Sequence, residues 1–117
     1  MQTPIERAIF HGEVVEGMSF NEKCWALLSR IPKGKVSTYG DLAHALGTKA
    51  YRAVGNAMNR NPYAPAVPCH RVVGSDGRLT GYAHGLKKKR EMLEREGVAC
   101  KNDRVSLADR FTFGRDA

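Results

Sequence analysis

The stretch VSTYGDLAHALGTKAYRAVGNAMNR, residues 36–60, decides the predicted fold, because it contains two short amphipathic helices in succession. Thr38 fits the N-cap of the first helix, and Asp41 lies near the positive end of its dipole. Gly47 suits the position beyond its C-terminus, and Thr48 can cap the second helix at once. The apolar residues at helical spacing are Leu42, Ala43 and Leu46, then Ala50, Ala53, Val54, Ala57 and Met58. This arrangement has the dimensions of a helix-turn-helix.

An ordinary helical hairpin gives the same pattern, and such hairpins are commoner than helix pairs that bind DNA. Two features favour a surface that lies close against a partner. The surrounding sequence is basic, and Gly55 and Ala57 are small. The polar residues left to point outward from the second helix are Arg52, Asn56, Asn59 and Arg60.

The net charge of +7 is concentrated in the middle of the chain. Residues 31–95 hold 12 basic and 4 acidic residues, whereas residues 1–30 hold 3 and 4, and residues 96–117 hold 4 of each. A concentrated basic region indicates a polyanionic partner, most commonly nucleic acid. A solvated basic surface without a partner explains the charge alone equally well.

Length and composition indicate a small globular protein. A chain of 117 residues predicts a single domain, and 42% hydrophobic with 26% charged residues argues against disorder. No apolar run approaches the roughly 20 residues of a membrane span. Residues 1–10 have no apolar core of a secretory signal. Cys24, Cys69 and Cys100 form no CxxC pair, so neither a disulfide framework nor a zinc site is indicated, and Cys24 is expected to be a buried, inert thiol.

The remaining segments predict a mainly α, winged-helix-like fold. Ser19 begins a capping box and hence a helix that stops before Pro32. Three prolines in residues 61–68 predict an extended, stiff connection. Residues 71–80 predict a short β-hairpin, the wing, and residues 86–96 a C-terminal helix.

The two ends carry weaker patterns. We expect residues 1–18 to be a short N-terminal extension and residues 98–117 a tail, within one domain spanning residues 1–117. Phe111 and Phe113 are expected to fold the tail back onto the core. The basic run at residues 87–90 is expected to be a solvated helix face.

The sequence Pro68-Cys69-His70-Arg71 is the main candidate for chemistry. A cysteine beside a histidine in basic surroundings is a common way to obtain a thiolate near neutral pH. Neighbours in an extended segment point in opposite directions, so His70 would reach the Cys69 sulfur through a turn or a water. Taken alone, a core cysteine beside a hydrogen-bonded histidine is the commoner explanation. A metal site is disfavoured, because no further Cys or His pair stands at ligand spacing.

Residues 68–73, PCHRVV, resemble the active-site signature of the O6-alkylguanine-DNA alkyltransferases (methylated-DNA–protein cysteine methyltransferases), and the likeness extends from about Ser19 to Val98. Further segments match in order: residues 36–43 look like the first helix of the family's helix-turn-helix, 51–58 its recognition helix, 61–62 its asparagine hinge, 81–86 its substrate-pocket loop and 94–97 the end of its final helix. The chain is therefore identified as a catalytic-domain-only member.

The resemblance implies a chemistry for five residues. Cys69 would attack the alkyl carbon, and the guanine O6 would leave. Glu96 would orient and charge His70, which through a water would deprotonate Cys69. Tyr39 would donate a proton to the guanine N3, and Asn61 would tie the surrounding segments together. The thioether product has no good leaving group, so each molecule would act once, without cofactor or metal.

The resemblance also implies how DNA is bound. The damaged nucleotide would be flipped out of the duplex, and Arg52 would fill the vacated space. Small residues would bring the recognition helix close to the minor groove, without reading sequence. The implied DNA-binding set is Thr38, Tyr39, Arg52, Ala53, Gly55, Asn56, Arg60 and Arg71, and the implied pocket set is Val72, Tyr82, Ala83 and His84. We expect a monomer acting on duplex DNA with O6-alkylguanine, and with O4-alkylthymine as a further candidate substrate, in the cytoplasm at the nucleoid or in a nucleus.

Two departures and two rival functions accompany this interpretation. Many relatives carry an additional N-terminal domain, some with a zinc site there. His84 differs from the usual pocket residue, and this difference bears on which O6 substituents fit.

An alkyltransferase-like protein would bind alkylguanine without repair, but such relatives usually have tryptophan or alanine in place of the cysteine. A winged-helix regulator would explain the fold and charge but not Cys69 together with Tyr39 and Glu96.

Overall fold

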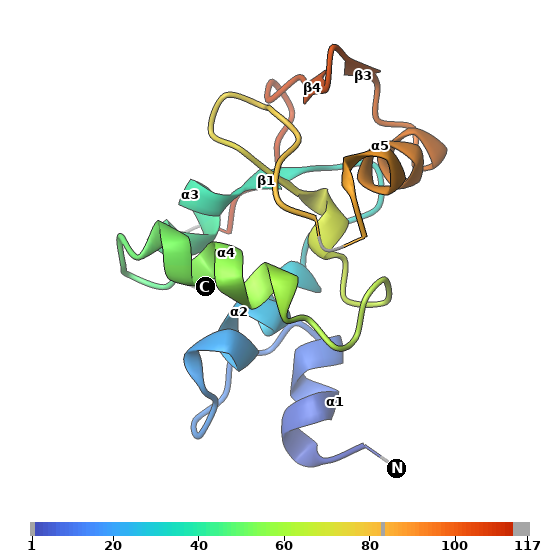
Figure 1. Cartoon of the computed structure of the whole chain (residues 1–117). Coiled ribbons are helices and arrows are strands. Elements are labelled where there is room, and N and C mark those ends of the chain that lie inside the picture. Colours follow the sequence, from blue (N-terminus) through green and yellow to red (C-terminus); the bar gives the residue numbers. More distant parts are fainter. Residues whose placement is uncertain (1, 83, 114–117) are drawn as a thin grey trace.

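The computed structural model describes residues 2–82 and 84–113, and these form a mainly helical fold, as predicted (Figure 1). The elements in chain order are α1 (Pro4–Phe10), α2 (Phe20–Leu28), β1 (Ser37–Thr38), α3 (Tyr39–Ala45), α4 (Tyr51–Asn59), a 3₁₀ turn η1 (Cys69–Arg71), β2 (Val72–Val73), α5 (Leu86–Arg95), β3 (Cys100–Lys101) and β4 (Arg104–Val105).

The predicted helix pair is α3 and α4, which pack against each other. The Thr38 side chain accepts from the backbone N–H of Asp41, and the Asp41 carboxylate accepts from that of Thr38, so the predicted cap is confirmed. Gly47 follows the helix with φ +69°, in the left-handed region that glycine favours. The prediction that Thr48 caps α4 is wrong. Ala50 is the N-cap, and the Thr48 hydroxyl instead accepts from the Ala50 N–H at 3.1 Å within the connecting turn.

The two N-terminal helices support this pair. Ser19 caps α2 through the predicted box with Glu22, but α2 ends at Leu28, ahead of the predicted stop, because a tight turn precedes the proline. Within the predicted extension, Thr3 begins a second capping box, and α1 follows it. Trp25 on α2 donates from Nε1 to the Ala57 carbonyl on α4 at 2.8 Å. This bond fixes α4 to α2.

The strand pairing differs from the predicted hairpin across residues 71–80. Val72–Val73 pairs in parallel with Ser37–Thr38, bringing the segment after Cys69 alongside the start of the helix-turn-helix. The predicted turn is present, because Gly77 donates to Gly74 O and Gly74 donates to Arg78 O, each at 2.9 Å. Beyond the turn, residues 77–79 bond to residues 103–105, since Val105 donates to Gly77 O at 2.9 Å and Leu79 to Asp103 O at 2.8 Å. Both valines are fully buried, so their backbone groups need partners inside the protein.

A short antiparallel hairpin that the sequence analysis did not predict lies at residues 100–105, within the predicted tail, where β3 pairs with β4. Asn102 and Asp103 form its turn with φ of 53° and 57°. Two successive residues at positive φ match the strand twist of a tight hairpin, and asparagine and aspartate tolerate this conformation best among non-glycine residues.

Two apolar clusters make the core. The larger lies among α1, α2, α3 and α4, and the smaller is formed by Val36, Val73, Leu79, Leu93 and Val105. Phe111 and Phe113 pack against the larger cluster, which confirms the expected return of the tail. Within the described ranges, none of the helices has the length and apolarity that crossing a bilayer demands.

Candidate active site and DNA-facing surface

Cys69 begins the 3₁₀ turn η1, and its side chain is buried, with 5% exposed. Its N–H donates to Val67 O at 3.0 Å, and the Arg71 N–H donates to Pro68 O at 3.0 Å. The expectation of an extended segment at this point is therefore wrong, because the backbone closes into a turn. The turn places consecutive side chains around one short axis rather than on opposite faces of a strand.

The preceding segment is built from turns rather than the predicted extended chain. Val67 donates to Tyr63 O at 3.0 Å. Asn61 closes the segment, because its Nδ2 donates to Val67 O at 2.8 Å and its Oδ1 accepts from the Tyr63 N–H at 2.9 Å. Asn61 thus holds the residues that lead directly into Cys69.

Burial raises the pKa of the Cys69 thiol above its ordinary value, while a hydrogen bond from Asn61 and the charge of Lys89 oppose the rise. At neutral pH the resting group is the thiol. Because the thiolate is the stronger nucleophile, a nearby base is needed to remove the proton.

His70 has the properties of that base. The ring is buried, and Nε2 lies 3.0 Å from Oε2 of Glu96. Nδ1 is buried and has no hydrogen-bond partner among the described residues. Burial lowers the pKa of His70, although Glu96 works against this, so the imidazole is neutral at pH 7. A carboxylate can only accept, so Nε2 carries the proton and the lone pair of Nδ1 is available.

Arg71 and Glu96 form a two-pronged ion pair. Arg71 Nε donates to Oε1 at 2.9 Å and Arg71 Nη2 to Oε2 at 2.7 Å, while Nη1 donates to Ile31 O at 2.7 Å. Burial works against the charge on Glu96, yet the hydrogen bonds from Arg71 and His70 hold its pKa below the usual range. Three N–H groups of the Arg71 guanidinium already have partners inside the protein. We therefore propose a positioning role for Arg71 in place of the predicted DNA contact.

Lys89 is a site residue that the sequence analysis missed. Its side chain is fully buried, and Nζ donates to Thr80 O at 2.6 Å and lies 5.9 Å from the ring centroid of Tyr39. The expectation that the whole basic run is solvated is therefore wrong at this position. Burial lowers the pKa of Lys89 to about 8, and the interaction with Cys69 opposes the shift. The sequence did carry a signal, because Lys89 precedes the buried Leu93 by four residues and so shares its helix face.

Tyr39 donates a hydrogen bond to the same carbonyl as Lys89. Its Oη donates to Thr80 O at 3.0 Å, and burial raises its pKa, so it remains protonated at neutral pH. Gly81 follows with φ +57°, and a Cβ at that position would lie 3.2 Å from the Tyr39 oxygen. The Thr80–Gly81 backbone therefore sets the positions of both the phenol and the ammonium.

Two hollows are lined by some of the remaining predicted residues, namely Arg52, Gly55, Tyr82 and His84. One of about 380 Å³ is lined by Tyr39, Tyr51, Arg52, Gly55, Asn59, Thr80 and Gly81. Another of about 430 Å³ is lined by Ala64, Pro65, Tyr82, His84, Lys88 and Met92. Tyr82 and His84 meet edge to face at 5.3 Å between centroids. Val72 has its side chain in the core, so it can offer a pocket only backbone, and Ala83 lies outside the described residues.

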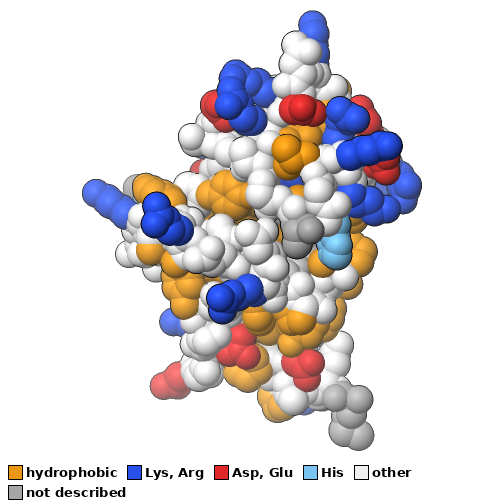
Figure 2. Space-filling model, viewed as in Figure 1, with side chains coloured by type: hydrophobic (Ala, Val, Ile, Leu, Met, Phe, Trp, Pro, Cys, Tyr) orange, Lys and Arg blue, Asp and Glu red, His pale blue; other side chains and the backbone are white. Residues whose placement is uncertain are grey.

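The outward face of α4 carries most of the predicted DNA contacts. Arg52, Asn56 and Arg60 are exposed, and Ala53 and Gly55 are half-buried. Thr38 and Ala57 are buried, the first as a helix cap and the second in the core, so neither side chain offers a surface to DNA. Figure 2 shows Lys and Arg side chains over the upper and middle parts of this face and mainly acidic ones at the lower end, where α1 and α2 lie in Figure 1.

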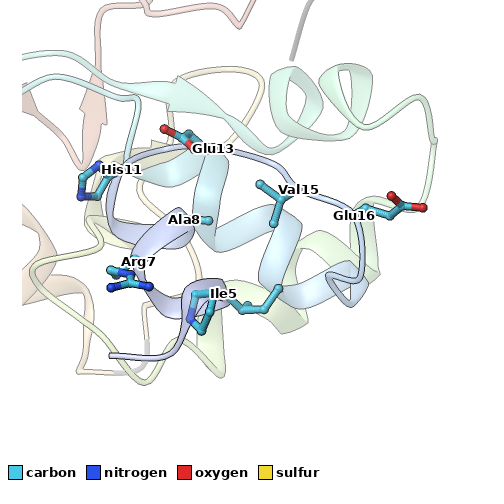
Figure 3. Close-up of a pocket in the computed structure, with 8 residues that line it drawn as sticks. Ile5, Arg7, Ala8, His11, Glu13, Val15 and Glu16 are labelled. Carbon is cyan, nitrogen blue, oxygen red and sulfur yellow. The ribbon is translucent and has the colours of Figure 1, made fainter. Parts of the chain in front are cut away.

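A separate hollow of about 510 Å³ lies beside α1 and the segment that follows it (Figure 3). Its polar lining residues are Arg7, His11, Glu13 and Glu16, and its apolar ones are Pro4, Ile5, Ala8 and Val15. None of the predicted catalytic residues lines it. Size alone therefore does not mark the site, whose assignment depends on the cluster around Cys69.

Comparison with known proteins identifies the family of this chain. Residues 19–98 match the family model described as 6-O-methylguanine DNA methyltransferase, DNA binding domain. The chain belongs to this family. The matched methyltransferase segment runs from the cap of α2 to just beyond Glu96, and it leaves out α1, the β3–β4 hairpin and the tail.

Three relatives illustrate the likeness. The methylated-DNA–protein-cysteine methyltransferase of Methanosarcina acetivorans is 53% identical over 83 residues, which cover 70% of this chain and 53% of that protein. A Mycobacterium tuberculosis OGT in complex with DNA has a TM-score of 0.65 at 42% identity, covering 79% of this chain and 63% of the other. S. pombe Atl1 in complex with damaged DNA containing O6-carboxymethylguanine has a TM-score of 0.70 at 32% identity, covering 79% and 93%. The chain spans about half the length of the curated relatives it matches.

Proposed function

We propose that this protein repairs DNA by moving the alkyl group of O6-alkylguanine onto the sulfur of Cys69, once per molecule. The observation that carries the proposal is the cluster of a buried thiol, a neutral His70 whose Nδ1 has no partner in the described part of the chain, and Glu96 on the opposite ring nitrogen. These are the parts of a nucleophile, a base and a group that orients the base.

The proposed reaction is a displacement at carbon. His70 takes the thiol proton at Nδ1, through a water, and the sulfur of Cys69 bonds to the alkyl carbon as the bond from that carbon to guanine O6 breaks. The electron pair leaves with the guanine, and a proton from Tyr39 offsets its charge. The raised pKa of Tyr39 keeps that proton on the phenol until it is needed. The DNA product carries normal guanine. The sulfur ends as a thioether, so the protein is consumed.

DNA binding in this proposal uses the exposed side of α4. Arg52 enters the duplex as the damaged nucleotide leaves it, and Asn56 and Arg60 lie along the backbone on the same exposed side. The helix approaches through the minor groove, where the half-buried Ala53 and Gly55 offer little bulk. The chain works as a single domain and a monomer, without sequence preference, in the compartment that holds the DNA.

The second candidate is recognition without repair. The resemblance to Atl1 favours it, because this chain covers 93% of that structure, which holds damaged DNA. The presence of Cys69 favours repair, because a buried thiol precedes a histidine that bonds to Glu96.

The test uses duplex DNA that contains one O6-methylguanine with a radiolabelled methyl group. We expect label to move to the protein up to one equivalent, and Cys69→Ser to abolish transfer while retaining affinity for the duplex. Cys100→Ser is the matched control and should transfer normally, since that thiol lies away from the site on β3. Tight binding with all label left on the DNA would establish recognition without repair. If the protein neither binds the duplex nor takes up label, both functions are excluded.

A further inference from the structure

Tyr51 is an apolar side chain without a partner on the proposed DNA-facing surface. Its side chain is 54% exposed, and Leu86 is the other large hydrophobic residue that the structure records as exposed. Within the described part of the chain, its hydroxyl makes no hydrogen bond and its ring faces no other aromatic ring. An exposed ring of this size has no role in holding the fold together, so its surroundings indicate its use.

Tyr51 forms a ridge between two hollows. One is the hollow of about 380 Å³ that it shares with Tyr39 and Arg52. The other, of about 310 Å³, is lined by His44, Gly47, Thr48, Lys49 and Tyr51 itself. Tyr51 therefore stands at the start of α4, between the cations Lys49 and Arg52 in sequence and between two depressions in space.

A planar ring flanked by cations fits nucleic acid better than it fits another protein surface. Aromatic rings stack on bases or enter between base steps, and the neighbouring cations bind the adjacent phosphates. A second copy of this chain would bring Lys49 and Arg52 against the same two cations, which disfavours a contact between copies. Charge and shape therefore select DNA as the occupant.

We propose that Tyr51 is a second DNA-inserting residue, which stacks on the base next to the extruded nucleotide while Arg52 fills the vacated position. This inference rests on the proposed function and deepens it. Arg52 replaces the lost base, and Tyr51 supports the neighbouring base that has lost one stacking partner. The two adjacent side chains would then hold the duplex open from one helix end.

The test measures affinity for a duplex containing O6-methylguanine, in a Cys69→Ser background so that no DNA is consumed. Tyr51→Ala should weaken binding about 5- to 150-fold, the range expected for loss of one base–aromatic stack. Tyr51→Phe keeps the ring and should bind within about 2-fold of the parent, whereas Tyr51→Leu should resemble Tyr51→Ala. 2-Aminopurine beside the lesion should lose its protein-induced fluorescence change with Tyr51→Ala and retain it with Tyr51→Phe.

A second measurement separates this inference from the proposed function. In protein with Cys69 intact, Tyr51→Ala should slow repair of the duplex more than it slows the reaction with free O6-benzylguanine, because the free base needs no stacking on a duplex. If the unmutated protein repairs DNA and Tyr51→Ala binds equally well, this inference is wrong and the function stands. Leucine as effective as phenylalanine would also overturn it. The inference would also be wrong if Tyr51→Ala lost self-association without a change in DNA affinity. If the unmutated protein neither binds nor repairs the duplex, both the inference and the proposed function are wrong.

Discussion

His70 and Glu96 meet end to end, with Nε2 3.0 Å from Oε2. This contact decides which ring nitrogen holds the proton, because a carboxylate only accepts hydrogen bonds. The other nitrogen, Nδ1, is buried and unpartnered among the described residues. The pair therefore prepares the imidazole to take a proton at one defined atom, next in sequence to Cys69.

The rate of transfer should depend on pH in a direction set by this pair. Burial lowers the pKa of His70 below 6.5, so the midpoint of the acid limb of the rate should lie below pH 6.5. Burial also raises the pKa of Cys69 above 9.0, so the midpoint of the alkaline limb, where the thiolate forms directly, should lie above pH 9.0. Single-turnover rates with free O6-benzylguanine across this range would measure both limbs.

Two variants check the assignment of the acid limb. His70→Asn should slow the reaction near neutral pH and remove the acid limb, leaving the alkaline rise. Glu96 raises the pKa of His70, so Glu96→Gln should move the acid limb to lower pH. An acid midpoint above 6.5 in the unmutated protein would contradict a buried neutral histidine.

Arg71→Met should destabilise the protein without changing the salt dependence of its binding to duplex DNA. The change leaves the largely buried Glu96 without two of its hydrogen bonds, and we expect the free energy of unfolding to fall by about 3 kcal/mol. The salt dependence of duplex binding should be unaltered, because this guanidinium touches no phosphate. Urea unfolding and binding over a range of salt concentrations would measure the two effects.

Arg60→Met is the matched control for that experiment. Arg60 is exposed on the proposed DNA face, so its loss should reduce the slope of log affinity against log salt by about 0.9 with little change in stability. An equal loss of slope in Arg71→Met would restore Arg71 to the DNA-binding set.

Gly81→Ala should impair transfer through Tyr39. The new Cβ would lie 3.2 Å from the Tyr39 oxygen, and φ is +57°, so the phenol or the loop has to move. We expect a loss of stability of about 1 kcal/mol from the backbone and a reaction with free O6-benzylguanine slower by about 10-fold from the displaced donor.

Gly47→Ala separates the two causes. Gly47 has φ +69°, and a Cβ there meets nothing within 4 Å. It should lose similar stability while reacting with the free base at the unmutated rate. Equal rates for the two alanine variants would show that Tyr39 does not depend on the space at Gly81.

Lys89→Met should change the pH dependence of stability. The pKa of Lys89 is about 8 in the folded protein and 10.5 ordinarily, so the unfolded chain binds more protons between these values. The free energy of unfolding of the unmutated protein should therefore rise, relative to the variant, as pH increases from about 8 to 10.5. Chemical unfolding at several pH values would measure this difference.

The same variant should also affect Cys69. Lys89 lowers the pKa of that thiol, so Lys89→Met should move the alkaline limb of transfer to higher pH. Lys87→Met removes an exposed charge of the same helix and should alter neither profile. An unchanged stability profile in Lys89→Met would show that the ammonium is hydrated rather than buried.

Local signals made most of the helices predictable. Ser19 and Thr38 each precede a helix with an acidic residue three positions on, and the capping bonds form as expected. The resemblance around PCHRVV located Cys69, His70 and Glu96, and the structure brings His70 and Glu96 into contact.

Features that depend on distant partners were not predictable from the sequence alone. Val72–Val73 could pair with a neighbouring strand or a remote one, and a short apolar run does not distinguish them. Arg71 looked like a phosphate ligand because its partner Glu96 lies on another element. Lys89 looked solvated because its charge outweighed its place on the buried helix face.

The uneven charge over the surface makes the molecule an electric dipole. Residues 1–30 are close to neutral, with 3 basic and 4 acidic residues, whereas residues 31–95 are strongly basic, with 12 and 4. A duplex exerts a torque on such a body within a Debye length, about 8 Å at physiological salt, and turns the recognition helix toward the phosphates. The molecule would thus meet DNA with α4 already facing the duplex. Fewer encounters would then be unproductive during a search for one altered base among many.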